Sequence, residues 1–345
     1  MNAPRKWQIA CPAGLVTGGP EALHQLAHTA RSLGIDARMV YLGRAKGAEL
    51  PTVPEPYRIY GPVLDPGLDD DARTLVIVPE TETPRLRALR RAGRAIWWLS
   101  IDNYEVTAAQ ARERWRRLWW KRWNGRVALP FELTAPEPGM LHLAQSDYAR
   151  QVLAAHGIHE SLMLTDYLRD DFLAQARHGG AAVARQPRRI AYNPKKGFEA
   201  TQAIIAAAAG RFEFVPIQQM TPQQVVELLC STAVYIDFGH HPGRDRIPRE
   251  AAACGCRVLT GRRGAAANGV DIPVPASLKI DETAPDFAEQ AVAALQRLVE
   301  QPAGSETMSV HYRAIIMAQK EMFAKEVQAL AGRVGTPLAG PLAIA

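Results

Sequence analysis

The sequence predicts an α/β protein built from two doubly wound domains, each with a parallel sheet that helices cover on both faces. Short apolar, β-rich runs alternate with helix-like segments along the chain, and this order of elements builds βαβ units. Runs such as TLVIV and AVYIDF are apolar almost throughout, as strands are when both of their faces are buried. The length of 345 residues is typical of two domains rather than one.

The strands are short apolar runs, and each helix-like stretch lies between two of them. In the first half we expect strands at residues 7–11, 37–42, 74–78, 95–99, 141–145 and 162–164, with helices at 20–33, 84–92, 107–123 and 147–156. In the second half we expect strands at 189–192, 212–217, 233–238 and 257–260, with helices at 197–208, 222–230, 249–254 and 308–331.

The boundary between the domains is expected after residue 168. Residues 169–188 contain Gly-Gly, a proline and charges of both signs, which indicates a helix and a linker. The predicted parts are a first domain (1–168), a second domain (169–306), a final helix (307–333) and a loose tail (334–345). Two doubly wound domains bind ligands at the carboxyl ends of their strands, so we expect a site in the cleft between them.

Composition and charge exclude several classes of protein. No apolar run approaches the ~20 residues that a membrane-spanning helix needs, and the N-terminus carries no signal-peptide pattern. The spacing of the 4 cysteines fits neither a zinc site nor a disulfide framework, so we expect a thiol-reduced, cytoplasmic protein. The net charge of +6 arises from Arg85–Arg126, where 12 basic residues accompany 3 acidic ones. Because the basicity is local, nucleic-acid binding is a weak interpretation.

Two glycine-containing turns connect predicted strands to predicted helices. The first, GLVTGGPE, places Gly18 and Gly19 before Pro20, where free backbone N–H groups can receive a phosphate or a sugar. A plain turn explains this pattern equally well. The second, YNPKKG, places Lys196 and Gly197 at the start of a helix. An ammonium group beside a helix N-terminus suits a diphosphate, and a solvated lysine pair is the competing interpretation.

The most informative segment runs from Phe238 to Thr260. A strand ends at Phe238, and the next loop carries two histidines, three arginines and an aspartate before a helix that contains Glu250. A loop so rich in hydrogen-bonding groups is costly unless it is solvated or used. Its position at the carboxyl end of a strand therefore indicates a binding site.

The segment PREAAACGCRV, with the glycine loop before it and the upstream Lys-Gly, resembles the donor domain of GT-B glycosyltransferases. The likeness is greatest to the large, mostly retaining family of bacterial polysaccharide and lipid glycosyltransferases. It covers nearly the whole chain, with Gly18-Gly19 matching the N-terminal glycine loop and residues 165–168 matching the interdomain crossover. The resemblance implies the GT-B fold, in which two Rossmann-like domains face each other and the C-terminal helix packs back on the first.

The resemblance also implies how a nucleotide sugar would bind. Lys196 would bind the donor diphosphate, Glu250 would hydrogen-bond the ribose, and Gly243 would approach the sugar and phosphate through its backbone. With the histidine pair assigned to the sugar, the predicted donor-binding residues are Gly18, Gly19, Lys196, His240, His241, Gly243, Arg244, Arg246 and Glu250.

The chain departs from the family pattern at three places that bear on activity. Residues 100–104 (SIDNY) stand where the family has a histidine-containing segment after the fourth strand. Pro242 stands where many members have a first glutamate. An arginine that often precedes the Lys-Gly segment is missing, and Arg244 or Arg246 would supply its charge. The absence of the first glutamate favours a non-catalytic polysaccharide- or nucleotide-binding relative as an alternative.

The predicted chemistry uses neither a metal ion nor a cofactor, and its substrate is a UDP or GDP sugar. Cleavage of the sugar–diphosphate bond leaves negative charge on the phosphate, which lysine, arginine and a helix N-terminus can stabilise. A metal-dependent fold would need an Asp-x-Asp after a strand, whereas Asp69–Asp71 precede one. His240 and His241 are candidate metal ligands, but we identify no third ligand at a suitable spacing.

Asp102 is the catalytic candidate. It follows the apolar run RAIWWLS, whose carboxyl end should reach the cleft. An aspartate there is suited to orient the acceptor hydroxyl or to act as its general base. An N-cap of the next helix is the competing interpretation.

The segment ARERWRRLWWKRW has the periodicity of an amphipathic helix. One face carries Trp115, Trp119, Trp120 and Trp123, and the opposite face carries Arg114, Arg117 and Lys121. Docking on an anionic membrane surface, stacking on acceptor sugars and packing on the first sheet each explain the pattern. Packing is favoured, because Leu118 and Ala111 share the tryptophan face.

We therefore predict a metal-independent glycosyltransferase that moves a sugar from a nucleotide-diphosphate donor to a glycan or a lipid-linked acceptor. The expected context is surface polysaccharide biosynthesis, in the cytoplasm or at the inner face of the membrane. A nucleotide-sugar epimerase, the non-catalytic relative named above and a nucleic-acid glucosyltransferase acting through Arg85–Arg126 are the alternatives.

Overall fold

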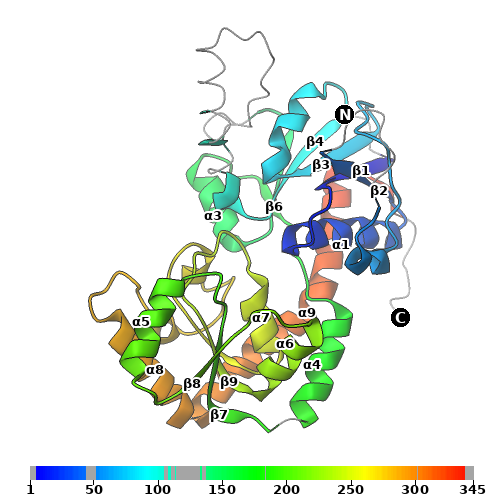
Figure 1. Ribbon diagram of the computed structural model, residues 1–345. Coiled ribbons are helices and arrows are strands. Elements are labelled where there is room, and N and C mark those ends of the chain that lie inside the picture. Colours follow the sequence, from blue (N-terminus) through cyan, green and yellow to red (C-terminus); the bar gives the residue numbers. More distant parts are fainter. Residues whose placement is uncertain are drawn as a thin grey trace. The chain divides into compact units, whose positions relative to one another are not determined.

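The computed structural model describes residues 5–43, 52–104, 108, 109, 113, 133, 137–182, 184–300 and 302–338. The chain divides into two compact units, of which unit 1 comprises Met1–Asp166 and Glu321–Ala345, and unit 2 comprises Tyr167–Lys320. Each unit contains one sheet of parallel strands (Figure 1). The predicted α/β class with two parallel sheets is confirmed.

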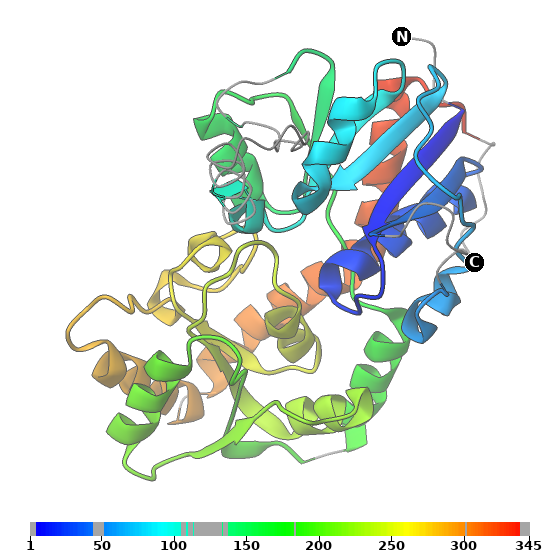
Figure 2. The same ribbon diagram turned by 45° about the horizontal axis from the view of Figure 1, so that its top comes forward.

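Unit 1 contains a six-stranded sheet with the order β2-β1-β3-β4-β5-β6. Its strands are β1 (Lys6–Pro12), β2 (Asp36–Leu42), β3 (Thr74–Pro79), β4 (Gly93–Trp98), β5 (Met140–Ala144) and β6 (Ser161–Met163). Figure 2 shows the first strands of this sheet, in blue and cyan, running in the same direction. The order reverses at β1, which pairs with both β2 and β3, so the sheet is doubly wound.

Helical segments cover both faces of the unit 1 sheet. They are α1 (Gly18–Ser32), η1 (Glu55–Tyr60), η2 (Glu80–Ala88) and α3 (Asp147–Ala155). One face, which includes Trp98, packs against Leu86 of η2 and Leu153 of α3. On the other face, Trp97 stacks on Phe323 of the C-terminal helix α9 (Pro302–Val334), with ring centroids 6.3 Å apart.

Unit 2 contains a four-stranded sheet with the order β10-β9-β7-β8. Its strands are β7 (Gln186–Tyr192), β8 (Glu213–Pro216), β9 (Thr232–Asp237) and β10 (Arg257–Thr260). Its helical segments are α4 (Asp170–Ala182), α5 (Phe198–Ala208), α6 (Pro222–Ser231), α7 (Arg246–Ala253), η3 (Ala265–Ala267), η4 (Ala276–Leu278) and α8 (Phe287–Glu300). Figure 1 shows α5 and α8 on one side of this sheet and α4 and α6 on the other.

The alternating side chains of β7 explain this division of helices. Ile190 points into the apolar cluster that α5 and α8 complete. Ala191, the next residue, belongs to the cluster formed with α4, α6 and α7. Because both faces are buried, the strand is apolar at consecutive positions, as its sequence predicts.

The C-terminal helix differs from its prediction. It begins at Pro302 rather than near residue 308, and the division between units falls within it, after Lys320. The residues after it are not simply a loose tail, because Thr336 is buried and its hydroxyl accepts a hydrogen bond of 3.0 Å from the Trp7 indole. Residues 339–345 lie outside the described part of the chain.

Two further differences concern helices. The helix α8 was not predicted. The predicted helix at 84–92 is a 3₁₀ segment that begins at Glu80. It contains Pro84, which cannot donate a backbone hydrogen bond. The predicted tryptophan–arginine helix lies outside the described residues. Among the helices that are described, none is both long enough and apolar enough to cross a bilayer.

Glu80 is a buried carboxyl group at the carboxyl end of β3. It accepts a hydrogen bond of 3.0 Å from the backbone N–H of Leu99, just after β4. Burial raises the pKa of Glu80 to about 7, against the opposing effect of backbone N–H groups that include those of Leu99 and Ser100. The carboxyl group thus ties β3 to the loop that leads to Asp102.

The pH dependence of unfolding should report this carboxyl group. Between about pH 5 and 7 the folded chain keeps a proton on Glu80 that the unfolded chain has released, so the stabilisation is lost as the pH rises. The free energy of unfolding of Glu80→Gln, measured relative to that of the parent protein, should rise by on the order of 3 kcal/mol from pH 5 to pH 8. Urea unfolding followed by tryptophan fluorescence measures it in unit 1, because all 7 tryptophans precede residue 124.

Glu82→Gln is the matched control. Glu82 belongs to the same segment and pairs with Arg85 at 3.3 Å near the surface, so its replacement should shift stability equally at all pH values tested. A constant difference between Glu80→Gln and the parent protein would contradict the assignment.

Candidate functional site

The first part of the site is the loop between β7 and α5. Its residues Asn193–Gly197 follow the end of the strand and precede the first turn of the helix. The Asn193 side chain accepts a hydrogen bond of 3.0 Å from the backbone N–H of Lys195, which fixes the turn. Lys196 therefore lies beside the N-terminus of α5, as predicted, where the helix dipole favours negative charge.

Two glycines bring this loop into backbone contact with the loop after β9. Gly197 has φ of 58°, and a Cβ atom on it would lie 2.4 Å from the carbonyl of Phe238. A Cβ atom on Gly239 would lie 2.4 Å from Cβ of Lys196. Both contacts are shorter than side-chain carbons tolerate, so glycine at these positions sets how closely Lys196 approaches the second loop.

The second part of the site is the loop between β9 and α7, where three side chains form a row. Asp237 ends β9, and its Oδ1 lies 3.3 Å from Nε2 of His241. Nδ1 of His241 lies 3.3 Å from Oδ2 of Asp245, and the same oxygen accepts a hydrogen bond of 2.5 Å from Nζ of Lys196. The row thus links the buried end of β9 to the lysine at α5.

Asp237 is the buried end of this row. It accepts hydrogen bonds from the Tyr235 hydroxyl at 2.9 Å and the Gly239 backbone N–H at 3.0 Å. Burial alone would raise the pKa of Asp237, but the contacts with His241, Gly239 and Tyr235 lower it overall. Burial and the neighbouring Asp237 raise the pKa of Tyr235. The carboxylate is therefore the ionised partner and the phenol the neutral donor.

The loop after β9 is held from both sides. Arg249 of α7 is buried and donates to the backbone carbonyls of Asp245 and Arg244, each at 3.3 Å, and to Gln319 of α9 at 3.2 Å. On the other side, the backbone N–H of Ala265 donates to the His241 carbonyl at 2.8 Å. These contacts fix the backbone that carries the aspartate and the histidine.

Glu250 lies one helical turn after Arg246 on α7. Its Oε1 accepts a hydrogen bond of 2.6 Å from Nε of Arg246, and the Glu250 side chain is mostly buried. The two predicted donor-binding residues thus form an i,i+4 ion pair. Gly243 and Arg244 lie between His241 and Asp245 in the loop that precedes this helix.

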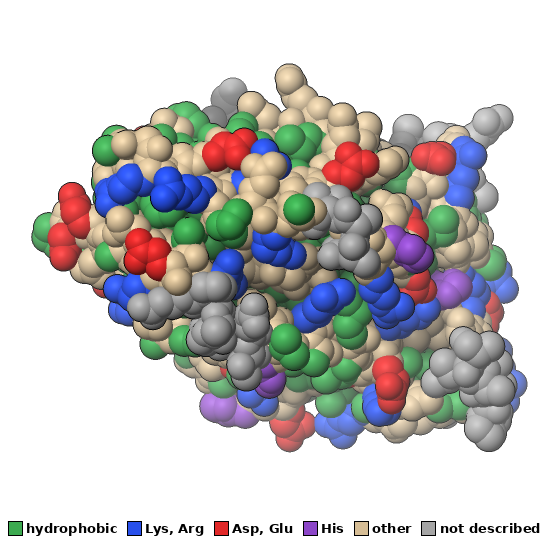
Figure 3. Space-filling view, turned by 90° about the horizontal axis from the view of Figure 1, so that it is seen from below, with side chains coloured by type: hydrophobic (Ala, Val, Ile, Leu, Met, Phe, Trp, Pro, Cys, Tyr) green, Lys and Arg blue, Asp and Glu red, His purple; other side chains and the backbone are tan. Residues whose placement is uncertain are grey.

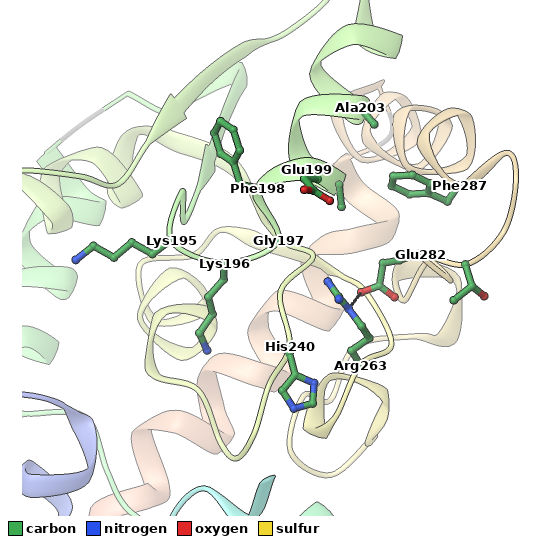
Figure 4. Close-up of a pocket in the computed structure, with 12 residues that line it drawn as sticks. Lys195, Lys196, Gly197, Phe198, Glu199, Ala203, His240, Arg263, Glu282 and Phe287 are labelled. Carbon is green, nitrogen blue, oxygen red and sulfur yellow. Dashed lines mark hydrogen bonds and ion pairs between the residues drawn. The ribbon is translucent and has the colours of Figure 1, made fainter. Parts of the chain in front are cut away.

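A pocket of about 800 Å³ opens at the start of α5. Its lining includes Lys196, His240, Arg263, Glu282 and Phe287. Figure 4 shows Lys196 extending toward His240, whereas Lys195 points away from both. Nε of Arg263 lies 3.4 Å from Glu282, and its Nη2 donates to the Phe238 carbonyl at 2.7 Å. The pocket therefore combines cationic groups with an apolar wall at the carboxyl ends of β7, β9 and β10.

The predicted residues divide between this pocket and its surroundings. Lys196 and His240 line the pocket, whereas Glu250 and Arg246 do not. His241 is fully buried and faces two carboxylates. The structure therefore places His241 where it holds the loop, and not where it would contact a sugar in this pocket.

Gly18 and Gly19 lie in unit 1, at the first turn of α1. The helix begins two residues earlier than predicted, at Gly18 rather than Pro20. A Cβ atom on Gly18 would meet nothing within 4 Å in this structure, so no packing contact requires glycine there. Close approach of a ligand stays a prediction for this turn.

Asp102 lies in a short helical turn after β4. The Tyr148 hydroxyl of α3 lies 3.0 and 3.2 Å from the two oxygens of Asp102 and donates to this carboxylate. This contact orients the side chain. The proposed N-cap role concerns residues 105–107, which lie outside the described part of the chain.

The row of Asp237, His241 and Asp245 was missed in sequence. Their ligand-type atoms lie within 4.8 Å of one another, and they are the one such group found among the described residues. The identical spacing of four residues on each side of His241 was an available signal. No third metal ligand was expected beside the histidine pair, and the structure shows that two carboxylates flank His241. Lys196 already pairs with Asp245, and the absence of a metal stays a prediction.

Comparison with solved structures identifies the fold as GT-B. Sucrose-phosphate synthase from Thermosynechococcus elongatus superposes with a TM-score of 0.63 at 14% identity, over 96% of this chain and 99% of that one. HepE from Anabaena, in complex with UDP and glucose, gives 0.59 at 12% identity, over 96% and 99%. WaaG, a glycosyltransferase involved in lipopolysaccharide biosynthesis, gives 0.53 at 12% identity, over 95% and 99%. Neither a protein-family model nor a curated sequence matches the chain.

Gly197→Ala should destabilise unit 2, because the new Cβ atom meets the Phe238 carbonyl. Positive φ alone costs an alanine about 1 kcal/mol, and the clash should raise the loss in free energy of unfolding to about 3 kcal/mol or more. Denaturant unfolding followed by circular dichroism, with hydrogen exchange of β7 and β9, measures the loss.

Gly210→Ala separates the clash from the backbone strain. Gly210 has φ of 77°, and nothing lies within 4 Å of its Cβ position. Its variant should lose only about 1 kcal/mol. Equal losses in the two variants would contradict a steric requirement for glycine at residue 197.

Proposed function

We propose that unit 2 binds the diphosphate of a nucleotide sugar at Lys196 and that the protein is a glycosyltransferase. The observation that carries this proposal is the position of Lys196, which lines a pocket of about 800 Å³ beside the N-terminus of α5. Lysine and helix amides both stabilise phosphate oxygens. The GT-B fold, which the solved complex of HepE with UDP and glucose shares, supports the same proposal.

The chemistry follows from where charge develops. When the bond between sugar and diphosphate breaks, the electron pair stays with the leaving phosphate, and preorganised cationic groups lower the barrier. Lys196 and the first turn of α5 are proposed to hold that charge, with His240 and Arg263 lining the same pocket. Because side chains and helix amides are proposed to supply the stabilisation, transfer should persist when divalent ions are chelated.

Glu250 is proposed to bind the ribose hydroxyls. Its carboxylate is ionically paired with Arg246 at 2.6 Å, which orients it as an acceptor. A UDP or GDP sugar fits the proposal equally, because the roles proposed for Lys196 and Glu250 concern the diphosphate and the ribose, which the two donors share.

On the acceptor side, we propose that Asp102 of unit 1 orients or deprotonates the acceptor hydroxyl. The Tyr148 hydroxyl fixes its carboxylate. A glycan or lipid-linked acceptor in surface polysaccharide synthesis is proposed, supported by the fold shared with WaaG. On the face seen in Figure 3, basic side chains are interleaved with acidic and apolar ones, whereas a nucleic-acid surface would cluster its basic side chains.

Isothermal titration with UDP, GDP and UDP-glucose tests the proposal. The parent protein should bind at least one of them, and Lys196→Ala should weaken binding about 30-fold or more, as loss of a charge-assisted hydrogen bond does. Release of UDP from UDP-glucose, measured in the presence of a chelator, distinguishes a transferase from a non-catalytic binding protein.

Lys195→Ala is the control for the lost charge. Lys195 lines the same pocket but points away from Lys196 and His240 (Figure 4), so its variant should bind within about twofold of the parent protein. An equal or larger effect at Lys195, or no binding of any nucleoside diphosphate by the parent protein, would refute the proposed donor site.

A further inference from the structure

Asp245 holds the same ammonium group that the proposed function assigns to the diphosphate. Its Oδ2 accepts a hydrogen bond of 2.5 Å from Nζ of Lys196. The two side chains are 20% and 32% exposed, so a ligand in the pocket can reach the lysine. A carboxylate and a phosphate oxygen compete for the same donor, because both are anionic acceptors.

The position of Asp245 in the chain makes this contact unusual. Asp245 is the N-cap of α7, where an aspartate normally accepts a hydrogen bond from the second or third backbone N–H of the helix. Its side chain makes no such capping bond. The third helical residue is Pro248, which has no N–H to donate. The carboxylate is therefore turned from its own helix toward Lys196.

His241 offers the carboxylate a second partner. Its Nδ1 lies 3.3 Å from the same Oδ2 of Asp245, and its Nε2 faces Asp237 at 3.3 Å. A ring nitrogen that carries an N–H can donate it to the carboxylate that it faces. The ring is fully buried and the Asp237 carboxylate is fixed by Tyr235. Asp245 can thus lose Lys196 and still have His241 beside its carboxylate.

We infer that Asp245 is an internal counter-ion of Lys196. When the diphosphate of the donor binds, it displaces the Asp245 carboxylate from Lys196, and the carboxylate stays beside His241. The inference rests on the proposed role of Lys196. An anion that binds at Lys196 must first break the Lys196–Asp245 ion pair, and this lowers the affinity of the site for the anion. Asp245 is thus a positioning residue that sets the affinity of the site for anions.

Replacing Asp245 should therefore strengthen anion binding, which the loss of a merely structural residue would not do. Asp245→Asn keeps the size of the side chain and removes its charge. Inorganic pyrophosphate, titrated by calorimetry, should bind about tenfold or more tightly than to the parent protein. The gain should disappear in Asp245→Asn combined with Lys196→Ala. Asp245→Ser, with a side chain that suits an N-cap, should show the same gain. It provides the test if Asp245→Asn does not fold.

Asp170→Asn is the matched control. Asp170 forms an ion pair of the same length, 2.5 Å, with Lys320, and both side chains are exposed. The variant changes the net charge of the protein equally, so a gain common to both aspartates would overturn the inference. Unchanged or weaker binding of pyrophosphate by both folded Asp245 variants would overturn it as well.

The outcomes separate this inference from the proposed function. If Asp245→Asn gains pyrophosphate affinity through Lys196 while no sugar nucleotide binds, the counter-ion role stands and the transferase proposal fails. If UDP binds through Lys196 and neither Asp245 variant gains affinity, the transferase proposal stands and the counter-ion role fails.

Discussion

The arrangement of unit 2 depends on the contact between two strand-to-helix loops at Gly197 and Gly239. With no Cβ atom at either position, the backbone after β9 lies against the residue before α5. Lys196 is thereby placed beside Asp245 instead of extending into solvent. A single extra methyl group at this contact would separate a cation from the loop that balances its charge. The chemistry proposed for the pocket is therefore a consequence of backbone packing.

The charges beyond that contact form a chain that ends in the core. Asp237 is buried at the end of β9, and a buried carboxylate is costly unless hydrogen bonds and an opposite charge compensate it. Tyr235, Gly239 and His241 supply that compensation. The same logic explains why a loop with so many polar residues can pack tightly. Arg249 donates hydrogen bonds to two of its backbone carbonyls, and its charges alternate in sign.

The strands, which are local apolar runs, were recognised from the sequence, whereas one helix, α8, and the contacts between distant segments were not. The strands could be predicted because apolar runs recur at regular intervals. The position of Lys196 beside a helix N-terminus could be predicted because the lysine directly precedes a glycine and a helix. The role of Asp245 was missed because its partner, Lys196, is 49 residues away in the chain, and no pattern in the sequence predicts that contact. Pocket residues such as Glu282 and Phe287 follow β10 in a segment whose helix went unrecognised. His241 was expected to contact a sugar, but the structure shows its imidazole ring buried between two carboxylates.

A crystal structure with UDP bound tests the central claim most directly. The account predicts a diphosphate oxygen within hydrogen-bonding distance of Nζ of Lys196, about 2.9 Å, with the Asp245 carboxylate moved off the lysine and still beside His241. A diphosphate bound elsewhere, with the Lys196–Asp245 ion pair intact, would contradict it.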